Sequence, residues 1–315
     1  MISIEKYEPA RHADWNRLVK LAPNGLFLFD RNYMDYHADR FTDHSLLFIE
    51  DGQPIALLPA NIDNARNLVS HGALTFGSLI RTPKLRSRNI QALFDKLIEY
   101  SEAQSFASIA YKAIPPAFQD RPTEDDLYAL HRCGFKLIGR DLSSVIPLDQ
   151  PPKYSKGRKW SIGRASKHGV SIRSDDQIGP FYDILTGRLG TKYSTKPTHS
   201  KDELALLTSR FPNNIQISCA YFDNAPEPCA GVTLYDYGRT LHTQYMTTTD
   251  EGRDIGALDF LIDHHISEAR RLGKVFFSFG ISTEKQGATL NPGLVQQKES
   301  FGAKAVVHDI YKLTL

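Results

Sequence analysis

The sequence predicts an α/β protein of two tandem domains, each a mixed sheet with helices on both faces. Two observations carry this prediction: a long internal repeat, and strand and helix patterns that follow the same order in both halves. The repeat aligns positions 168 residues apart, and the identical pairs include Gly134 with Gly302, Lys136 with Lys304 and Asp141 with Asp309. Solenoid units recur every ~20–50 residues, so a repeat of this length indicates a duplicated domain.

The repeat continues upstream through a helix-like and a strand-like segment. Ile90, Leu93, Phe94 and Ile98 fall on Leu258, Leu261, Ile262 and Ile266. The run 106–111 falls on 274–279 without a gap. A proline-rich break at 147–152 separates the two copies, so we expect domains of residues 1–148 and 149–315. Function is expected where the copies have diverged.

Length and composition are those of a globular protein. The 315 residues are 41% hydrophobic and 23% charged, and the net charge of +2 gives no general attraction to DNA or to a membrane surface. The N-terminus lacks the basic and apolar regions of a signal peptide, so none is expected. The sequence contains no run of about 18 apolar residues, so no transmembrane helix is expected either. The three cysteines, Cys133, Cys219 and Cys229, are expected to be reduced, in a cytoplasmic protein.

Each half is expected to begin with a strand and two helices, which are followed by a hairpin and a third strand. The first hairpin turns at Asp51-Gly52, a dipeptide typical of tight hairpin turns, and the second turns at Asp223-Asn224. The expected strands are residues 46–58 and 68–79 in the first half and residues 215–222, 230–235 and 241–248 in the second.

A helix, a buried strand and a second helix complete each half. Apolar residues at 258, 261, 262 and 266 have the spacing of a helix that packs on a sheet. The nearly continuous apolar run at 275–279 predicts a strand covered on both faces. The last helix of each half ends at a glycine, Gly134 or Gly302, before a final strand.

An ordered set of short motifs runs through the chain. The motifs lie at residues 70–77, 164–170, 197–200, 242–245, 279–284, 290–291 and 298–302. Together with the order of elements, this set resembles the GNAT acyltransferases, and two such domains in tandem resemble their Fem-like branch. That branch includes the peptidoglycan aminoacyltransferases and the FemAB-like proteins of polysaccharide gene clusters. No single motif is diagnostic, and the likeness rests on the set.

The resemblance implies that a loop in the second half binds the pyrophosphate of acyl-CoA. GNAT enzymes hold this group on backbone N–H groups at a helix start, in the pattern Arg/Gln-x-x-Gly-x-Gly/Ala, because glycine lets the backbone approach the anion. The candidate residues are Arg253, Asp254, Ile255, Gly256 and Ala257. Leu258 departs from the pattern, and residues 85–88 of the first half contain no glycine. The alternative interpretation is that the glycines only open a helix turn.

The resemblance also places the acyl group between two strands that splay apart, here residues 241–248 and 275–282. On the first of these strands, His242, Gln244 and Met246 are expected to share one face. His242 is a candidate proton acceptor, because the pKa of histidine suits proton transfer near neutral pH. The remaining candidates are Glu284 as a second proton acceptor, Tyr311 as the acid for the departing thiolate, and Gln244, Tyr245 and Ser282 as substrate contacts.

Each catalytic candidate also has a purely structural interpretation. A lone strand histidine such as His242 more often forms a hydrogen bond inside the sheet. Glu284 begins a loop that solvent can reach, and Tyr311 fits a core position in the last strand. His264 and His265 are adjacent on a helix and cannot face one ion together, so we expect no metal site.

A basic segment follows the expected domain boundary. From Pro151 to Ser174 the sequence has seven Lys or Arg residues and no Asp or Glu. Arg164 and Lys167, three apart on a predicted helix, are candidates for binding phosphate on a nucleotide- or lipid-linked acceptor or on tRNA. The resemblance supports this, since Fem-like relatives use basic residues near this place, although a solvated helix face explains them equally. His71, Tyr111 and Lys112 are expected to form an acceptor-side wall in the first domain.

Three functional classes follow from the resemblance. The first is an N-acyltransferase that uses acyl-CoA, with acetyl-CoA expected, as co-substrate and acts on an amino sugar or a nucleotide- or lipid-linked sugar of a surface polysaccharide. The second is an aminoacyl-tRNA-dependent transferase acting on a cell-wall precursor, although the sequence shows no long heptad-like arm of the kind some Fem enzymes carry. The third is a non-catalytic binding protein with the same fold. The sequence names neither the acceptor nor the oligomeric state.

Overall fold

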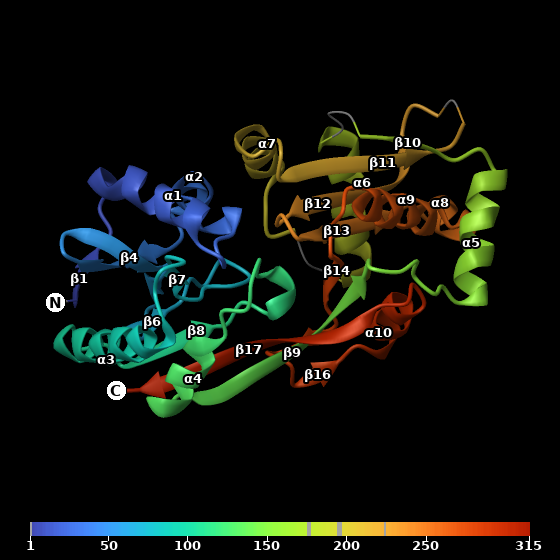
Figure 1. The fold of residues 1–315 in the computed structure, drawn as a ribbon. Coiled ribbons are helices and arrows are strands. Elements are labelled where there is room, and N and C mark those ends of the chain that lie inside the picture. Colours follow the sequence, from blue (N-terminus) through green and yellow to red (C-terminus); the bar gives the residue numbers. More distant parts are fainter. Residues whose placement is uncertain (1, 175–177, 194–196, 224) are drawn as a thin grey trace. The chain divides into compact units, whose positions relative to one another are not determined.

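The computed structural model describes residues 2–174, 178–193, 197–223 and 225–315 (Figure 1). Contacts divide the chain into two compact units. Unit 1 comprises Met1–Leu142, Thr283–Leu290 and Val307–Leu315, and unit 2 comprises Ser143–Ser282 and Asn291–Val306. The boundary expected at residues 148 and 149 remains a prediction, because this division by spatial contact assigns residues 143–148 to unit 2 and two late segments to unit 1.

Unit 1 contains two groups of paired strands. The antiparallel group has the order β1-β3-β4-β7 and comprises Ile2–Lys6, Leu46–Glu50, Gln53–Leu58 and Ile80–Arg81. The second group has the order β2-β5-β6-β8-β17 and comprises Thr42–Asp43, Asn61–Ile62, Asn67–Val69, Ser108–Lys112 and the last part of Lys304–Thr314. Strands β6 and β8 pair in parallel, so this sheet is mixed. A small hairpin, β15 (Thr283–Glu284) with β16 (Thr289–Leu290), also belongs to unit 1.

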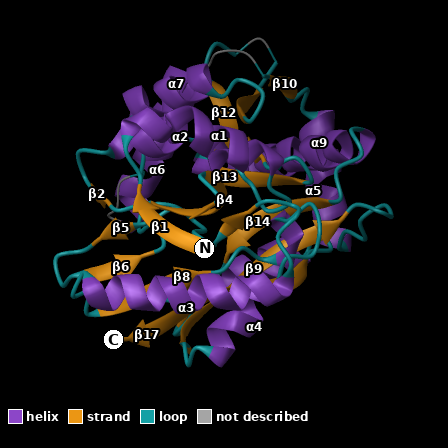
Figure 2. Cartoon of the chain, turned by 60° about the vertical axis from the view of Figure 1, so that its left-hand side comes forward, coloured by secondary structure: helices purple, strands orange, loops and turns teal. Residues whose placement is uncertain are grey.

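The helices of unit 1 pack on these strands. They are α1 (His12–Leu21), α2 (Arg31–Met34), α3 (Ser87–Ala103) and α4 (Asp125–Arg132), with short 3-10 helices at Pro9–Arg11, Phe27–Phe29, Asp35–His37 and Pro116–Phe118. Helix α3 lies along the strands (Figures 1 and 2), and it buries Leu93 and Phe94 in one core with Ile109 of β8. Burying a side chain of this size contributes roughly 1.5–3 kcal/mol.

The first hairpin forms as expected, whereas the third strand of the first half does not. Asp51 and Gly52 have φ values of 51° and 75°, which give the backbone twist of a tight two-residue hairpin turn. The single strand expected at 68–79 is wrong, since residues 70–79 form a loop between β6 and β7. A side chain on Gly77 would place its Cβ 1.8 Å from the carbonyl oxygen of Ser70, so this loop folds back tightly on itself.

The described residues of unit 2 form a sheet of six strands. Their order is β10-β11-β12-β13-β14-β9, and they comprise Ser171–Arg173, Ile215–Tyr221, Pro228–Asp236, Thr240–Thr248, Phe276–Ile281 and the last part of Lys136–Pro147. Strands β13 and β14 pair in parallel and the other pairs are antiparallel, so this sheet is also mixed. The turn expected at Asp223-Asn224 falls partly outside the described residues, because Asn224 is not described.

Helices cover both faces of the unit 2 sheet. They are α5 (Lys156–Lys167), α6 (Ile178–Tyr193), α7 (Lys201–Arg210), α8 (Asp250–Ile255), α9 (Ala257–Arg271) and α10 (Pro292–Glu299). On one face, Leu261 and Ile262 of α9 share a core with Val232 of β12. On the other face, Phe181 of α6 and Cys219 of β11 belong to a separate core. The described residues contain no helix long and apolar enough to cross a membrane.

The repeat read from the sequence corresponds to repeated elements. The 168-residue offset carries α3, β8, α4 and β9 of the first copy onto α9, β14, α10 and β17 of the second. The hairpins do not follow the same offset, because the second is longer: β11 and β12 run from Ile215 to Asp236, against Leu46 to Leu58 for β3 and β4. Two tandem α/β copies with mixed sheets are therefore confirmed.

Candidate functional site

The two central strands of unit 2 separate after a short parallel pairing. Strand β13 pairs with β14 only from Thr240 to His242, opposite Phe276 to Ser278. Beyond Ser278, strand β14 continues its pairing with β9, where Gly280 lies opposite Ser144. Backbone N–H and C=O groups that lose their partner strand at such a split need other hydrogen-bond partners. Side chains near the split are therefore candidates for a functional site.

A β-bulge changes which side chains share a face near the split. The register between β12 and β13 shifts at Thr233 and Leu234, which leaves Gln244 without an opposite residue. As a result, Met246 packs into the core beneath α9, whereas His242 lies beside Ser278 on the other face. The expectation that His242 and Met246 share one face is therefore wrong, because the bulge interrupts the two-residue period of the strand.

The most unusual side chain near the split was not singled out from the sequence. Lys298 of α10 is 4% exposed, and its ammonium donates to the carbonyl oxygens of Gly280 (2.9 Å) and Ile281 (2.6 Å) and to Oγ of Ser282 (2.7 Å). Burial lowers the pKa of Lys298 to about 8. The sequence signal was present in the Lys298-to-Gly302 motif, but burial of the lysine depends on tertiary packing.

A small cavity lies beside this lysine. Its volume is about 20 Å³, and Met246 of β13, Phe279 of β14, Leu258 of α9 and Lys298 are among the residues that line it. A cavity of this size holds about one water molecule. Most of its lining is apolar, and its polar side chains are Lys298, Asp259 and Gln297.

The candidate proton acceptors lie in different units. Nδ1 of His242 lies 3.0 Å from Oγ of Ser278, and a Cβ on Gly280, whose φ is +73°, would lie 3.2 Å from the imidazole ring. Glycine at 280 therefore leaves room for this histidine. Glu284 is exposed in the β15–β16 hairpin of unit 1. Its predicted catalytic role, like that of His242, remains a prediction.

Tyr311, the expected acid, also belongs to unit 1. Its hydroxyl donates to Oδ2 of Asp309 at 3.1 Å, and Asp309 in turn accepts two hydrogen bonds from Arg140 at 2.7 and 2.8 Å. Burial and the Asp309 carboxylate raise the pKa of Tyr311. The side chain is thus held in an ion-paired network of unit 1.

The expected donor loop contains a glycine with a structural explanation. Gly256 has φ +85° between α8 and α9, and a Cβ there would lie 2.2 Å from Oγ of Ser161 on α5. Ser161 in turn donates to Asp259 in the first turn of α9 at 2.7 Å. Close packing of α5 therefore requires glycine at 256, whatever the loop binds.

The other residues of that loop differ in exposure. Arg253 pairs with Asp250 at 2.7 Å on the surface, where both side chains are at least half exposed. Asp254 is exposed, Ile255 is partly buried and Ala257 is fully buried. The phosphate-binding role expected for residues 253–257 stays a prediction.

The expected substrate contacts of unit 2 lie in three places. The Tyr245 hydroxyl lies 2.6 Å from Nδ1 of His199, and burial raises the pKa of Tyr245. Gln244 is the bulge residue beside it, and Ser282 is buried against Lys298. Arg164 and Lys167 lie in the last turn of α5.

Of the expected acceptor-side residues of unit 1, His71 and Tyr111 are buried and Lys112 is partly buried. His71 has φ +40°, its Nδ1 has no hydrogen-bond partner, and burial lowers its pKa well below the usual value. Tyr111 is fully buried and donates to Oδ2 of Asp126 at 2.5 Å. Burial lowers the pKa of Lys112 to about 8. Tyr111 thus belongs to the core, and substrate contact by the three residues is still a prediction.

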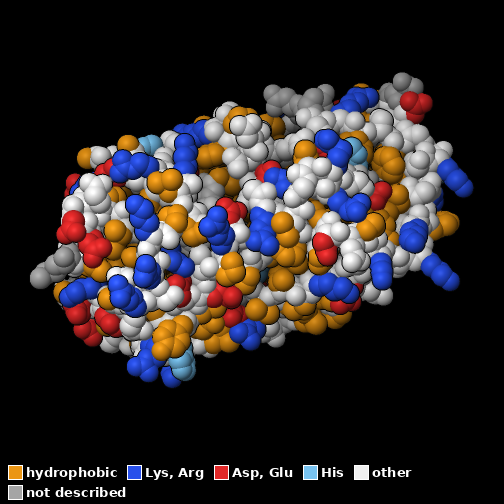
Figure 3. Space-filling view, in the orientation of Figure 1, with side chains coloured by type: hydrophobic (Ala, Val, Ile, Leu, Met, Phe, Trp, Pro, Cys, Tyr) orange, Lys and Arg blue, Asp and Glu red, His pale blue; other side chains and the backbone are white. Residues whose placement is uncertain are grey.

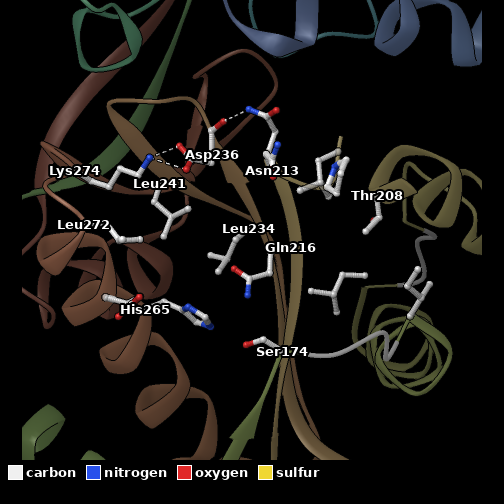
Figure 4. Close-up of a pocket in the computed structure, with 16 residues that line it drawn as sticks. Ser174, Thr208, Asn213, Gln216, Leu234, Asp236, Leu241, His265, Leu272 and Lys274 are labelled. Carbon is white, nitrogen blue, oxygen red and sulfur yellow. Dashed lines mark hydrogen bonds and ion pairs between the residues drawn. The ribbon is translucent and has the colours of Figure 1, made fainter. Parts of the chain in front are cut away.

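Unit 2 also contains a larger cavity (Figure 4). Its volume is about 480 Å³, and its lining includes residues from the start of β13, the end of α9 and the start of β11. His265 extends from α9 toward it and is 3% exposed, and burial lowers the pKa of His265 to about 3. The ion pair of Lys274 with Asp236, at 2.6 Å, lines one end. None of the candidate site residues lines this cavity.

The described residues contain no group of three or more His, Cys, Asp or Glu side chains placed to hold a metal ion. His265 is buried, whereas its neighbour His264 is exposed on α9. The two side chains therefore point in different directions.

Comparisons with known proteins identify the fold. No protein-family model matches the sequence, and no curated protein sequence matches it. Among solved structures, FemX is 14% identical with a TM-score of 0.68, covering 99% of this chain and 97% of that chain. The C-terminal domain (DUF2156) assigned to a lysylphosphatidylglycerol synthetase of Agrobacterium fabrum is 12% identical with a TM-score of 0.62, covering 96% of this chain and 91% of that chain.

A tandem GNAT protein from the clavulanic acid biosynthesis pathway is also similar. It is 10% identical with a TM-score of 0.54, and the match covers 100% of this chain and 98% of that chain. At these identities the similarity establishes the fold alone. The chain has the tandem GNAT fold of the Fem-like proteins, as the sequence predicted.

Proposed function

We propose that this protein is an N-acyltransferase that acts on the amine of an amino sugar, carried on a nucleotide or lipid, for a surface polysaccharide. The amine nitrogen attacks the carbonyl carbon of the acyl donor, and the new C–N bond forms. The bond from that carbon to the sulfur or oxygen of the donor then breaks. The amine gives up one proton, and the leaving group takes up one. The tandem GNAT fold supports this reaction class.

The buried ammonium at the strand split is the observation that carries this proposal. The three hydrogen bonds of Lys298 go to two carbonyls and a hydroxyl, and it forms no ion pair with a carboxylate among the described residues. Asp259 lines the same cavity but is paired with Arg158. A buried charge without an ionic partner is destabilising, and proteins keep such groups mainly at functional sites. An oxyanion that develops between β13 and β14 would be stabilised by this charge.

Acyl-CoA is the first candidate donor. The order of strand β13, short helix α8 and helix α9 supports it, because a helix start provides backbone N–H groups for a pyrophosphate. In this case Arg253 and the backbone of residues 254–257 would hold the phosphates. The acyl group would then lie near Phe279 and Lys298, at the point where β13 and β14 separate.

Aminoacyl-tRNA is the second candidate donor, and one specific observation favours it. Helix α5 covers Gly256 at the start of α9, where Ser161 lies within contact distance of the glycine. This packing explains the glycine without a bound pyrophosphate. The same helix presents lysines to solvent, which suits a polyanion.

The experiment separates the donors and tests the reaction. Dialysed protein is incubated with UDP-glucosamine and either acetyl-CoA or charged tRNA, and the acylated sugar is measured by mass spectrometry. Lys298→Met is the test variant, because methionine fills a similar volume without charge. We expect product from one donor with the wild type and loss of product with the variant. Absence of binding to both CoA and charged tRNA in calorimetry would contradict the proposal and favour the non-catalytic class.

A further inference from the structure

The outer face of α5 is basic and carries one exposed aromatic side chain. We define this α5 outer face as Lys156, Lys159, Trp160, Arg164 and Lys167. Trp160 lies four residues after Lys156 and four before Arg164, Lys167 follows three residues later, and Lys159 is adjacent to Trp160, so the set covers one side of the helix. Trp160 is 64% exposed. In Figure 3, Lys and Arg side chains gather at the edge of unit 2 where Figure 1 shows α5.

The inner face of α5 anchors the helix to unit 2. Arg158 forms an ion pair with Asp259 of α9, and its guanidinium lies 4.2 Å from the ring centroid of Phe301. Ala165 is fully buried on the same side. The helix is thus held by its inner residues, and the α5 outer face has no comparable packing role.

Two glycines on the exposed side of α5 are not required by the protein itself. A Cβ on Gly157 or Gly163 would have nothing within 4 Å. Glycine inside a helix costs roughly 0.5–1 kcal/mol relative to alanine, so these residues weaken α5 without a compensating contact from the described residues. Small residues around Trp160 leave its ring accessible to a partner.

The positive charge of the α5 outer face indicates which kind of partner it binds. Residues 151–174 contain seven Lys or Arg residues and no Asp or Glu, although the whole chain has a net charge of only +2. Arg164 lies 5.1 Å from the ring centroid of Trp160, so a cation and the exposed indole form one surface. A partner for this face is anionic and also accepts an aromatic side chain.

We infer that the α5 outer face docks on an anionic lipid bilayer. Tryptophan favours the headgroup region of a membrane, and lysines on either side of it can reach lipid phosphates. Trp160 lies near the middle of α5 with cations toward both ends, which matches a helix that lies in the plane of the interface. Single-stranded nucleic acid is usually bound by several stacking aromatics, and α5 contains only Trp160. This inference does not depend on the proposed function, because docking requires no turnover.

The test measures binding of the full chain to lipid vesicles. Vesicles of phosphatidylcholine alone are compared with vesicles that also contain phosphatidylglycerol. We expect partitioning at least about tenfold stronger on the anionic vesicles, falling as salt screens the charges. The chain has two tryptophans and Trp15 is fully buried, so a blue shift of emission on vesicles reports Trp160.

Matched variants locate the contact. Trp160→Ala and Lys156→Glu/Lys159→Glu are each expected to weaken partitioning about tenfold or more. Tyr128→Ala on α4 is the aromatic control, because Tyr128 is also 64% exposed. Lys84→Glu/Arg88→Glu is the charge control, since both residues are exposed in unit 1. The controls should partition like the wild type.

Three outcomes would overturn the inference. Equal binding to neutral and anionic vesicles would exclude a role for the charges. Unchanged partitioning of the folded α5 variants, checked by circular dichroism, would place the contact elsewhere. Absence of vesicle binding together with tRNA binding that the same variants abolish would show that this face binds nucleic acid.

Discussion

The two copies of the repeat place their buried polar groups in different positions. In unit 1, Tyr111 of β8 donates to Asp126 of α4 inside the core. The repeat offset carries these residues onto Phe279 and Leu294 of unit 2, which are apolar. In the reverse direction, Lys298 of α10 falls on Leu130 of α4, which is fully buried.

This difference between the copies distinguishes a polar pair with a structural role, Tyr111 with Asp126, from a candidate functional residue, Lys298. The Tyr111 hydroxyl donates to Asp126 and accepts from the backbone N–H of Leu79 at 2.8 Å, so the group is well satisfied in a closed core. Lys298 instead bonds the end of a strand that has separated from its neighbour. A buried polar group that is absent from the other copy and lies at a split is the better candidate for chemistry.

The largest expected effect follows from removing the ammonium of Lys298. Lys298→Met should lower kcat by about 10³-fold if the charge stabilises a developing oxyanion. Loss of three hydrogen bonds destabilises the variant and removal of a buried charge stabilises it, so we expect little change in Tm. Turnover and Tm are measured on the same preparation.

Leu130→Met is the matched control in the other copy. It makes a volume-conserving change at the repeat-equivalent position, so kcat should stay at the wild-type value. If Lys298→Met keeps kcat within threefold, the lysine only holds the strand end, and the two copies differ in packing alone.

The two mixed-sheet copies could be predicted from the sequence, but the burial of Lys298 could not. Repeat matches, apolar periods and turn dipeptides such as Asp51-Gly52 depend on local chemistry, so they predicted two mixed-sheet copies. Burial of Lys298 depends on where α10 packs, which periodicity does not reveal. The bulge at Gln244 had no sequence signal either, and it reversed the face expected for Met246 relative to His242. The loop at 70–79 depends on a close approach of Gly77 to Ser70, which only tertiary structure shows.

A second prediction compares the candidate proton acceptors of the two units. His242→Gln should lower kcat by about 10²-fold, because a positioned base typically contributes this much. Glu284→Gln should have less effect, since Glu284 is exposed in the β15–β16 hairpin. Rates are measured at pH 7 with Tm for each variant. If both variants keep kcat within threefold, neither residue is the base.

The smallest effect is a pH dependence of stability with opposite sign in the two copies. Burial raises the pKa of Asp126 to about 6 from 3.8, so the folded state retains a proton that the unfolded state releases. This contribution is fully present below pH 3.8 and is lost as pH rises through about 6. Burial lowers the pKa of Lys298 to about 8 from 10.5, so stability instead rises with pH between those values. Each window corresponds to about 3 kcal/mol at most.

Thermal melts of the wild type are compared with those of Lys298→Met and of Tyr111→Phe/Asp126→Leu. The double variant copies the Phe279 and Leu294 pair of unit 2. The double variant should lose the acid-side dependence and Lys298→Met the alkaline one. An acid-side dependence that persists in the double variant would show that another carboxyl group is responsible.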